Sequence, residues 1–161
     1  MNDIAWEKPN PPPNLSCRYF THSTETVLWA AKSEKSKHVF NYAAMKAVTG
    51  KQMKTVWTMS SPKNGEKTFG KHPTQKPVAL VERCVLASTH EGDLVFDPFL
   101  GGGTTAVACI RLKRGCVGIE LNFAHLTLAA KRADREIIEI WLHHFRVRIE
   151  VSVFRQDLSI C

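Results

Sequence analysis

LVFDPFLGGGTTAVACIRLKRGCVGIELN, residues Leu94 to Asn122, is the stretch of sequence that decides the fold of this chain. Its opening residues, 94–97, form an apolar run that is too short and too continuous for an amphipathic helix, which favours a buried parallel strand. The pattern then predicts a short helix over residues 104–112 and a second strand over residues 115–120. Strand, helix and strand in this order predict an α/β fold with a parallel sheet.

Three consecutive glycines, Gly101 to Gly103, lie between the first strand and the helix and allow a sharp turn that a ligand can approach closely. Thr104 or Thr105 can cap the helix, whose free N–H groups and positive dipole end would face that ligand. The second strand carries Glu120 to the same edge of the sheet, where nucleosides bind in open α/β sheets. A carboxylate there suits ribose hydroxyls because it accepts two hydrogen bonds at once.

Other interpretations of this turn are weaker but remain open. A phosphate cradle would need the lysine of a GxxxxGK[ST] motif, which the turn lacks. A nicotinamide dinucleotide site would need G-x-G-x-x-G, whereas the glycines here are consecutive. A purely structural strand–helix–strand unit with ordinary glycines is the remaining alternative.

Two motifs carry a resemblance to a known family. Residues 97–104, DPFLGGGT, resemble the DPFxGxGT motif of the amino-group DNA methyltransferases that modify adenine N6 or cytosine N4, and residues 72–77, HPTQKP, resemble the element that precedes it in the β arrangement of that family. The resemblance covers about Trp6 to Arg132. It implies a Rossmann-like S-adenosylmethionine-dependent methyltransferase sheet, S-adenosyl-L-methionine as the cofactor and double-stranded DNA as the partner.

The resemblance also implies roles for individual residues. Glu120 would hold the ribose, Asp97 would orient the turn and the ammonium group of the cofactor, and Phe99 would pack along its adenosine or methionine part. The family often has serine where Gly102 stands, so one hydroxyl contact is expected to be lost. The candidate cofactor-binding residues are His72, Thr74, Lys76, Asp97, Pro98, Phe99, Gly101, Gly102, Gly103, Thr104 and Glu120. The first three of these are candidates for the carboxylate of the cofactor, a role that is chemically open to all three.

Composition and charge bound the class of protein. The chain has 161 residues, which suits one domain, and a net charge of +7, which favours an acidic partner, nucleic acid first. Five cysteines without CxxC spacing indicate neither a zinc site nor a disulfide framework, so we expect a reducing cytoplasm and no metal. No apolar run is long enough to span a membrane.

Residues 43–71 are rich in lysine, with Trp57 and Phe69 among the lysines. Basic and aromatic residues in a turn-rich segment suit contact with phosphates and with an exposed base. By resemblance the segment is where the family has its target-recognition region, although a solvated lysine-rich loop is the alternative. The candidate DNA-binding residues are Lys46, Lys51, Lys54, Lys63 and Lys67.

The catalytic loop of the family, [DNS]PP[YFW], is absent from this sequence. Residues 10–13, NPPP, lack the final aromatic residue and follow no hydrophobic strand, so we assign no catalytic residue and expect an incomplete sheet. If the polypeptide is complete, it should bind the cofactor weakly or not at all and should not turn over. A truncated gene product, inactive alone, is the simpler explanation, and a homodimer or a partner chain that supplies the catalytic half is an alternative. A non-catalytic, basic DNA-binding remnant is another.

The remaining pattern predicts further elements. We expect a partial methyltransferase domain over residues 1–132, with residues 72–122 as its cofactor-binding unit, and a helix end and strand over residues 133–161. The expected elements are a hairpin of strands 26–31 and 38–42, helices over 78–89 and 123–142, the second capped by Asn122, and a strand over 146–155.

Overall fold

The computed structural model describes residues 1–141, so the strand expected over residues 146–155 lies outside the described residues. The strands are β1 (Asn2–Glu7), β2 (Thr24–Trp29), β3 (Val56–Thr58), β4 (Leu94–Asp97) and β5 (Gly115–Gly118). The helices are α1 (Tyr42–Thr49), the 3-10 turn η1 (Asn64–Lys67), α2 (Val78–Ser88), α3 (Thr104–Arg111) and α4 (Phe123–Trp141). None of the helices within this described part has the length and apolar character needed to cross a membrane.

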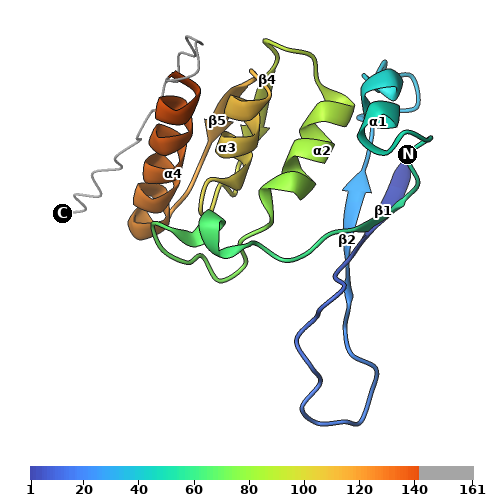
Figure 1. The fold of residues 1–161 in the computed structure, drawn as a ribbon. Coiled ribbons are helices and arrows are strands. Elements are labelled where there is room, and N and C mark those ends of the chain that lie inside the picture. Colours follow the sequence, from blue (N-terminus) through green and yellow to red (C-terminus); the bar gives the residue numbers. More distant parts are fainter. Residues whose placement is uncertain (142–161) are drawn as a thin grey trace, which may run out of the picture.

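The predicted strand–helix–strand unit is confirmed. β4 and β5 are parallel neighbours, with Phe96 opposite Val117, and α3 connects them. α3 packs against both α2 and α4, and the three helices lie side by side on one face of the two strands (Figure 1). This arrangement brings the carboxyl ends of both strands to one edge, where the glycine turn lies.

A second, separate sheet has the strand order β2–β1–β3. β1 is antiparallel to β2 and parallel to β3, and a long loop over residues 8–23 joins β1 to β2 (Figure 1). Trp6 on β1 and Trp57 on β3 are buried in its core with Met45 of α1 and Leu80 of α2. The Trp6 indole N–H donates to the carbonyl of Met59 at 2.8 Å, so this polar group is paired although the ring is buried.

The predicted hairpin of strands 26–31 and 38–42 is wrong. β2 pairs instead with β1, and the chain after Asn41 turns into α1. The physical reason is a tertiary contact, because the Asn41 side chain donates to the carbonyls of Leu86 and Thr89 at the end of α2. These two hydrogen bonds anchor Asn41 at the end of α2, while His38 and Phe40 contact Trp29 of β2 through their rings.

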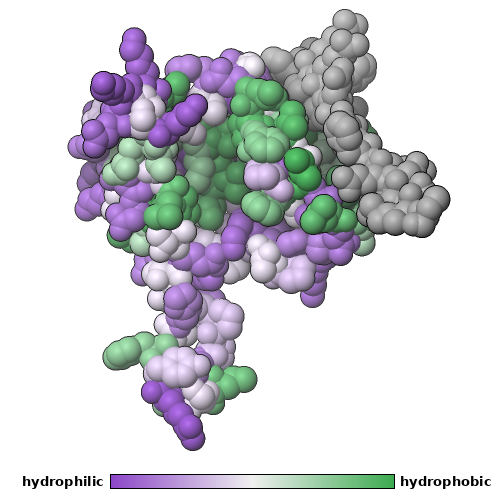
Figure 2. All heavy atoms as spheres, turned by 180° about the vertical axis from the view of Figure 1, so that it is seen from behind, coloured by the Kyte–Doolittle hydropathy of each residue, from purple (hydrophilic) through white to green (hydrophobic). Residues whose placement is uncertain are grey.

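The prediction that β4 is buried is wrong for one of its faces. Leu94 is 68% exposed and Phe96 is 61% exposed, and on β5 Val117 is 45% exposed. The helices cover only the opposite face, so large apolar side chains gather on the uncovered one, over β4 and β5, beside a hollow (Figure 2). We call this surface, formed by Leu94, Phe96, Val117 and Ile119, the open face.

Candidate functional site

The glycine turn owes its shape to backbone conformations that favour glycine. Gly101 has a φ of 54° and Gly103 a φ of 78°, both in the left-handed region. Gly103 is itself the N-cap of α3, without a side-chain cap hydrogen bond, so the prediction that Thr104 or Thr105 caps the helix is wrong. Each hydroxyl has another partner: Thr104 donates to the carbonyl of Lys76 at 3.3 Å, and Thr105 donates to Asp97 at 2.6 Å.

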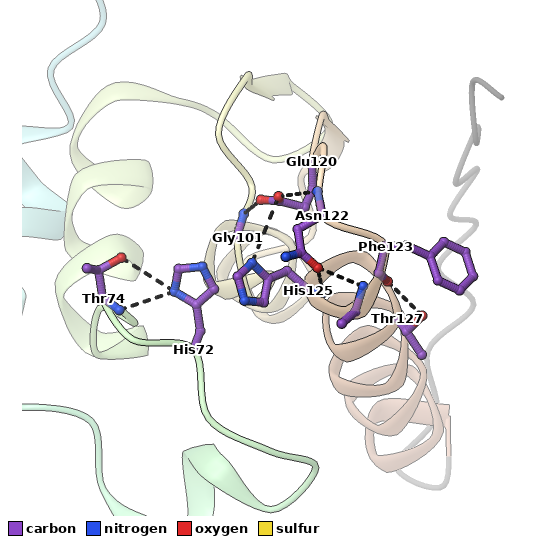
Figure 3. Close-up of polar contacts among 9 residues, drawn as sticks. His72, Thr74, Gly101, Glu120, Asn122, Phe123, His125 and Thr127 are labelled. Carbon is purple, nitrogen blue, oxygen red and sulfur yellow. Dashed lines mark hydrogen bonds and ion pairs between the residues drawn. The ribbon is translucent and has the colours of Figure 1, made fainter. Parts of the chain in front are cut away.

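Glu120 faces the glycine turn, as the sequence predicts. Its Oε2 accepts the N–H of Gly101 at 2.9 Å, and its Oε1 accepts the N–H of Asn122 at 2.7 Å (Figure 3). The Asn122 N–H is the largest influence on the pKa of this carboxyl group, which lies below its ordinary value because that bond and the Gly101 N–H outweigh desolvation. The group is therefore an ionised acceptor at neutral pH, and each oxygen keeps lone-pair capacity for a ligand.

His72 stands directly against the turn. A Cβ atom built on Gly101 would lie 3.1 Å from His72 Nε2, and the ring centroid lies 4.2 Å from that of His125 (Figure 3). Burial first, and then the neighbouring His125, lower the pKa of His72, although Glu120 acts in the opposite direction. Its imidazole is thus neutral at pH 7, and the structure brings the first residue of the HPTQKP segment to Gly101.

The other side of the turn packs against α4. A Cβ atom on Gly103 would meet Cα and Cβ of Ala129 at 2.7 Å, so only glycine allows this approach of helix and turn. The buried guanidinium of Arg132 donates to the carbonyl of Gly102 and, at 3.2 Å, to the hydroxyl of Thr104. Glu120 and Arg132 therefore hold the turn from opposite ends of its polar backbone, one on an N–H and one on a C=O.

Sequence reasoning missed both His125 and Arg132. A signal for Arg132 exists, because it follows Leu128 and Ala129 by four and three residues and so falls on the same buried stripe of α4. His125 lies in the first turn of that helix, whose predicted cap is confirmed: the Asn122 side chain accepts the N–H groups of Ala124 and His125.

Asp97 organises the start of the turn. One carboxylate oxygen accepts the N–H of Phe99 at 3.0 Å, and the other accepts the hydroxyl of Thr105. Pro98 lies between Asp97 and Phe99 in the chain. The Phe99 ring is 87% exposed, which leaves an aromatic surface available beside the turn, and its contact with a ligand stays a prediction.

Lys76 and Thr74 are placed differently from Glu120. The Lys76 ammonium bonds to Glu25 of β2 at 2.6 Å, and not to the turn, whereas its backbone carbonyl accepts Thr104. Thr74 is directed to Nδ1 of His72, which lies 3.3 Å from the Thr74 backbone nitrogen (Figure 3). A role of either side chain toward a cofactor carboxylate remains a prediction.

The candidate DNA-binding lysines fall into two groups. Lys46 lies on α1, and Lys51 and Lys54 lie between α1 and β3, whereas Lys63 and Lys67 flank or lie within η1. η1 is tied to the HPTQKP segment, because Glu66 accepts the N–H of Val78 at 2.9 Å and its carbonyl accepts the Gln75 amide.

Comparison with known proteins gives consistent relatives. The family model described as "DNA methylase" matches residues 1–131. The chain is 56% identical to the Type II methyltransferase M2.DpnII of Streptococcus pneumoniae over 138 residues, which are 84% of this chain and 52% of that protein. It is 47% identical to M2.MboI of Moraxella bovis over 154 residues, 95% of this chain and 56% of that protein. The chain thus spans about half the length of the curated relatives it matches.

Solved structures agree with this result. The M1.HpyAVI–SAM complex aligns with a TM-score of 0.69 and 41% identity over 82% of this chain and 61% of that one. The cytosine-N4-specific PvuII DNA methyltransferase aligns with a TM-score of 0.67 over 88% of this chain and 55% of that one. At 21% identity, the second match shows a shared fold only.

Proposed function

This chain belongs to the DNA methylase family, and we propose that its glycine turn and Glu120 bind S-adenosyl-L-methionine for methylation of an exocyclic amino group in double-stranded DNA, adenine N6 or cytosine N4. The observation that carries the proposal is the pairing of an ionised Glu120 with the N–H of Gly101 at 2.9 Å. It puts a carboxylate and a backbone turn without side chains at the ends of neighbouring parallel strands.

The residues present fit this cofactor. Glu120 has acceptor capacity for both ribose hydroxyls, and the carboxylate of Asp97 adds negative charge near a positively charged ligand, although its two oxygens already hold the turn. The exposed Phe99 ring can cover an adenine or a methylene chain. When bound, the cofactor supplies a methyl group on a sulfonium centre. These side chains would hold and orient that group, while Arg132 and Glu120 keep the turn in the observed shape.

Residues 1–161 contain no [DNS]PP[YFW] string, the loop that by resemblance would position the amino group of the base. The relatives are about twice as long as the matched part, and the open face presents uncovered apolar side chains beside the site. We propose that the segment that carries this loop, in the same polypeptide or in a partner chain, packs on the open face. Removal of Phe96 and its neighbours from water would stabilise that contact.

Calorimetric titration with S-adenosyl-L-methionine tests the cofactor site. Glu120→Gln should weaken binding at least about tenfold, because a neutral amide loses the charge-assisted acceptors for the ribose. Glu91→Gln is the matched control, since Glu91 is an exposed glutamate whose ion pair with Lys113, at 3.7 Å, is long. Equal affinities of Glu120→Gln and the unaltered chain would overturn the assignment, and heat with NAD in place of the methyl donor would indicate a dinucleotide enzyme.

One observation favours a second candidate, a non-catalytic DNA-binding subunit. The His72 ring already stands against Gly101, and both Glu120 oxygens already accept backbone N–H groups. A chain of this kind would bind duplex DNA through its net charge of +7 and give no heat with the methyl donor, so the same titration separates the two functions.

A DNA substrate and the free thiols of Cys17, Cys84, Cys109 and Cys116 support the cytoplasmic location that we propose.

A further inference from the structure

A basic pocket of about 410 Å³ lies where β1, β2, η1 and the HPTQKP segment meet. Its charged lining residues are Lys8, Glu25, Lys67, Lys71 and Lys76, with the neutral His72 at one side and Trp6 among them. Four ammonium groups face one carboxylate, so the pocket has an excess of three positive charges.

Glu25 fixes two of the ammonium groups in place. Its Oε1 accepts Lys8 Nζ at 2.6 Å and its Oε2 accepts Lys76 Nζ at 2.6 Å. Burial raises the pKa of Glu25, but the bonds from Lys76 and Lys8 outweigh that and lower it, so the carboxylate stays ionised. One carboxylate shared by two lysines leaves one positive charge uncompensated, in a fixed position.

Trp6 adds a second constraint on the same two lysines. Lys8 Nζ lies 5.0 Å from the ring centroid, and Lys76 Nζ lies 5.9 Å from it, within the range of cation–π attraction. The ammonium groups are therefore ordered before any ligand arrives, which lowers the entropic cost of binding an anion. Lys67 and Lys71, by contrast, have no side-chain partner among residues 1–141 and are available to a ligand.

We propose that this basic pocket binds a backbone phosphate of the DNA strand that enters the site, a step that rests on the proposed function. Two lysines that Glu25 holds in place, together with two that have no side-chain partner among residues 1–141, suit a phosphodiester, whose two non-bridging oxygens share one negative charge. His72 and Thr74 line the pocket, and His72 also stands against Gly101. A phosphate bound in the pocket would therefore be separated from the proposed cofactor site by His72. The DNA path then follows Lys67 and Lys71 in place of Lys46, on α1, and Lys51, between α1 and β3.

Fluorescence anisotropy of a labelled duplex at several potassium chloride concentrations tests the inference. The double variant Lys67→Gln/Lys71→Gln should weaken binding about tenfold or more and reduce the slope of log affinity against log salt by about 2, since each lost phosphate contact removes about one unit. The matched control is Lys35→Gln/Lys37→Gln, which removes the same charge at two exposed lysines between β2 and α1 and should leave affinity near that of the unaltered chain. Lys46→Gln/Lys51→Gln tests the alternative path. Competition by inorganic phosphate at millimolar concentration should be weak, because a free ion lacks the neighbouring phosphates of a strand.

The outcomes separate this inference from the proposed function. DNA binding that is lost in Lys46→Gln/Lys51→Gln but kept in Lys67→Gln/Lys71→Gln overturns the pocket and leaves DNA as the substrate. An unaltered chain that binds no duplex at low salt overturns both. Strong competition by inorganic phosphate alone would overturn the assignment to a DNA strand, because it would make the pocket a site for the free ion.

Discussion

The helix-covered face of the three-stranded sheet and the open face of the β4–β5 sheet differ in how far their apolar side chains are buried. On β1, Trp6 is 2% exposed and Ile4 is 7% exposed, because both point toward α1 and α2. On β4, Phe96 is 61% exposed and Leu94 is 68% exposed, because the helices cover the other face. The three-stranded sheet has an uncovered face too, with Leu28 of β2 77% exposed and Val56 of β3 59% exposed. Exposure therefore follows from which face the helices cover, and the open face differs because it lies beside the glycine turn and carries large apolar side chains on both of its strands.

The largest loss of stability should come from a substitution in the core of the three-stranded sheet. Trp6→Ala should lower the free energy of unfolding by about 4 kcal/mol, since a large buried ring is lost and the Met59 carbonyl loses its donor. Urea denaturation followed by circular dichroism measures the change. Phe20→Ala, at a position that is 97% exposed, is the control and should cost almost nothing. Similar costs for the two variants would mean that the three-stranded sheet is not the stable part.

The glycine turn should be the next most sensitive point. Gly103→Ala should cost about 3 kcal/mol, because the added Cβ meets Ala129 at 2.7 Å and φ is +78°. Gly50→Ala separates the two causes, since Gly50 has a φ of +71° but open space around it, and it should cost only about 1 kcal/mol. A Gly103→Ala variant as stable as Gly50→Ala would show that α4 can move away from the turn.

Local patterns explain how much of this unit the sequence predicted. Residues close together in the chain determine the boundaries of β4 and α2 and the helix cap by Asn122. The approach of Glu120 to Gly101 follows from the rule that parallel strands end at one edge of the sheet. These predictions are confirmed. The roles of the turn residues toward a bound cofactor stay predictions.

Long-range pairing explains what the sequence did not predict. β2 pairs with β1 across a long loop, and the alternation of Ile4 and Trp6 is too short to signal a strand. The orientation of Phe96 toward solvent depends on which face the helices cover, which no local pattern contains. Arginine is rarely buried, and the hydrogen bond from Arg132 to the carbonyl of Gly102, which explains its burial, is a tertiary contact that no local pattern contains.

Acid should weaken the glycine-turn unit. The pKa of His72 in the folded chain lies below its ordinary value of 6.5, so the folded state binds fewer protons there than the unfolded state. This contribution to stability is complete above pH 6.5 and is lost as the pH falls below it. Glu120 also stabilises the folded state less in acid, but at lower pH. Its pKa in the folded chain lies below 4.5, so its contribution is lost only as the pH falls below that value.

Urea denaturation at pH 7.5 and pH 5.5 tests the histidine window. The loss of stability between these values should be smaller in His72→Gln than in the unaltered chain, since the variant has no imidazole to protonate. His22→Gln, in the exposed loop after β1, is the control and should keep the full loss. An unchanged loss in His72→Gln would assign the acid sensitivity to another group.

The smallest effect is expected on the open face, and it tests the comparison most directly. Phe96→Thr puts a β-branched residue of high strand propensity into β4 and removes a ring that is mostly in water, so it should cost less than about 1 kcal/mol. Ile4→Thr makes the corresponding change on β1, where the side chain is 7% exposed, and should cost about 2 kcal/mol because a hydroxyl is buried. If Phe96→Thr costs as much as Ile4→Thr, the open face is already covered in solution. A stability that then rises with protein concentration would identify a second copy of this chain as the cover, and would overturn the proposal that the loop-bearing segment packs there.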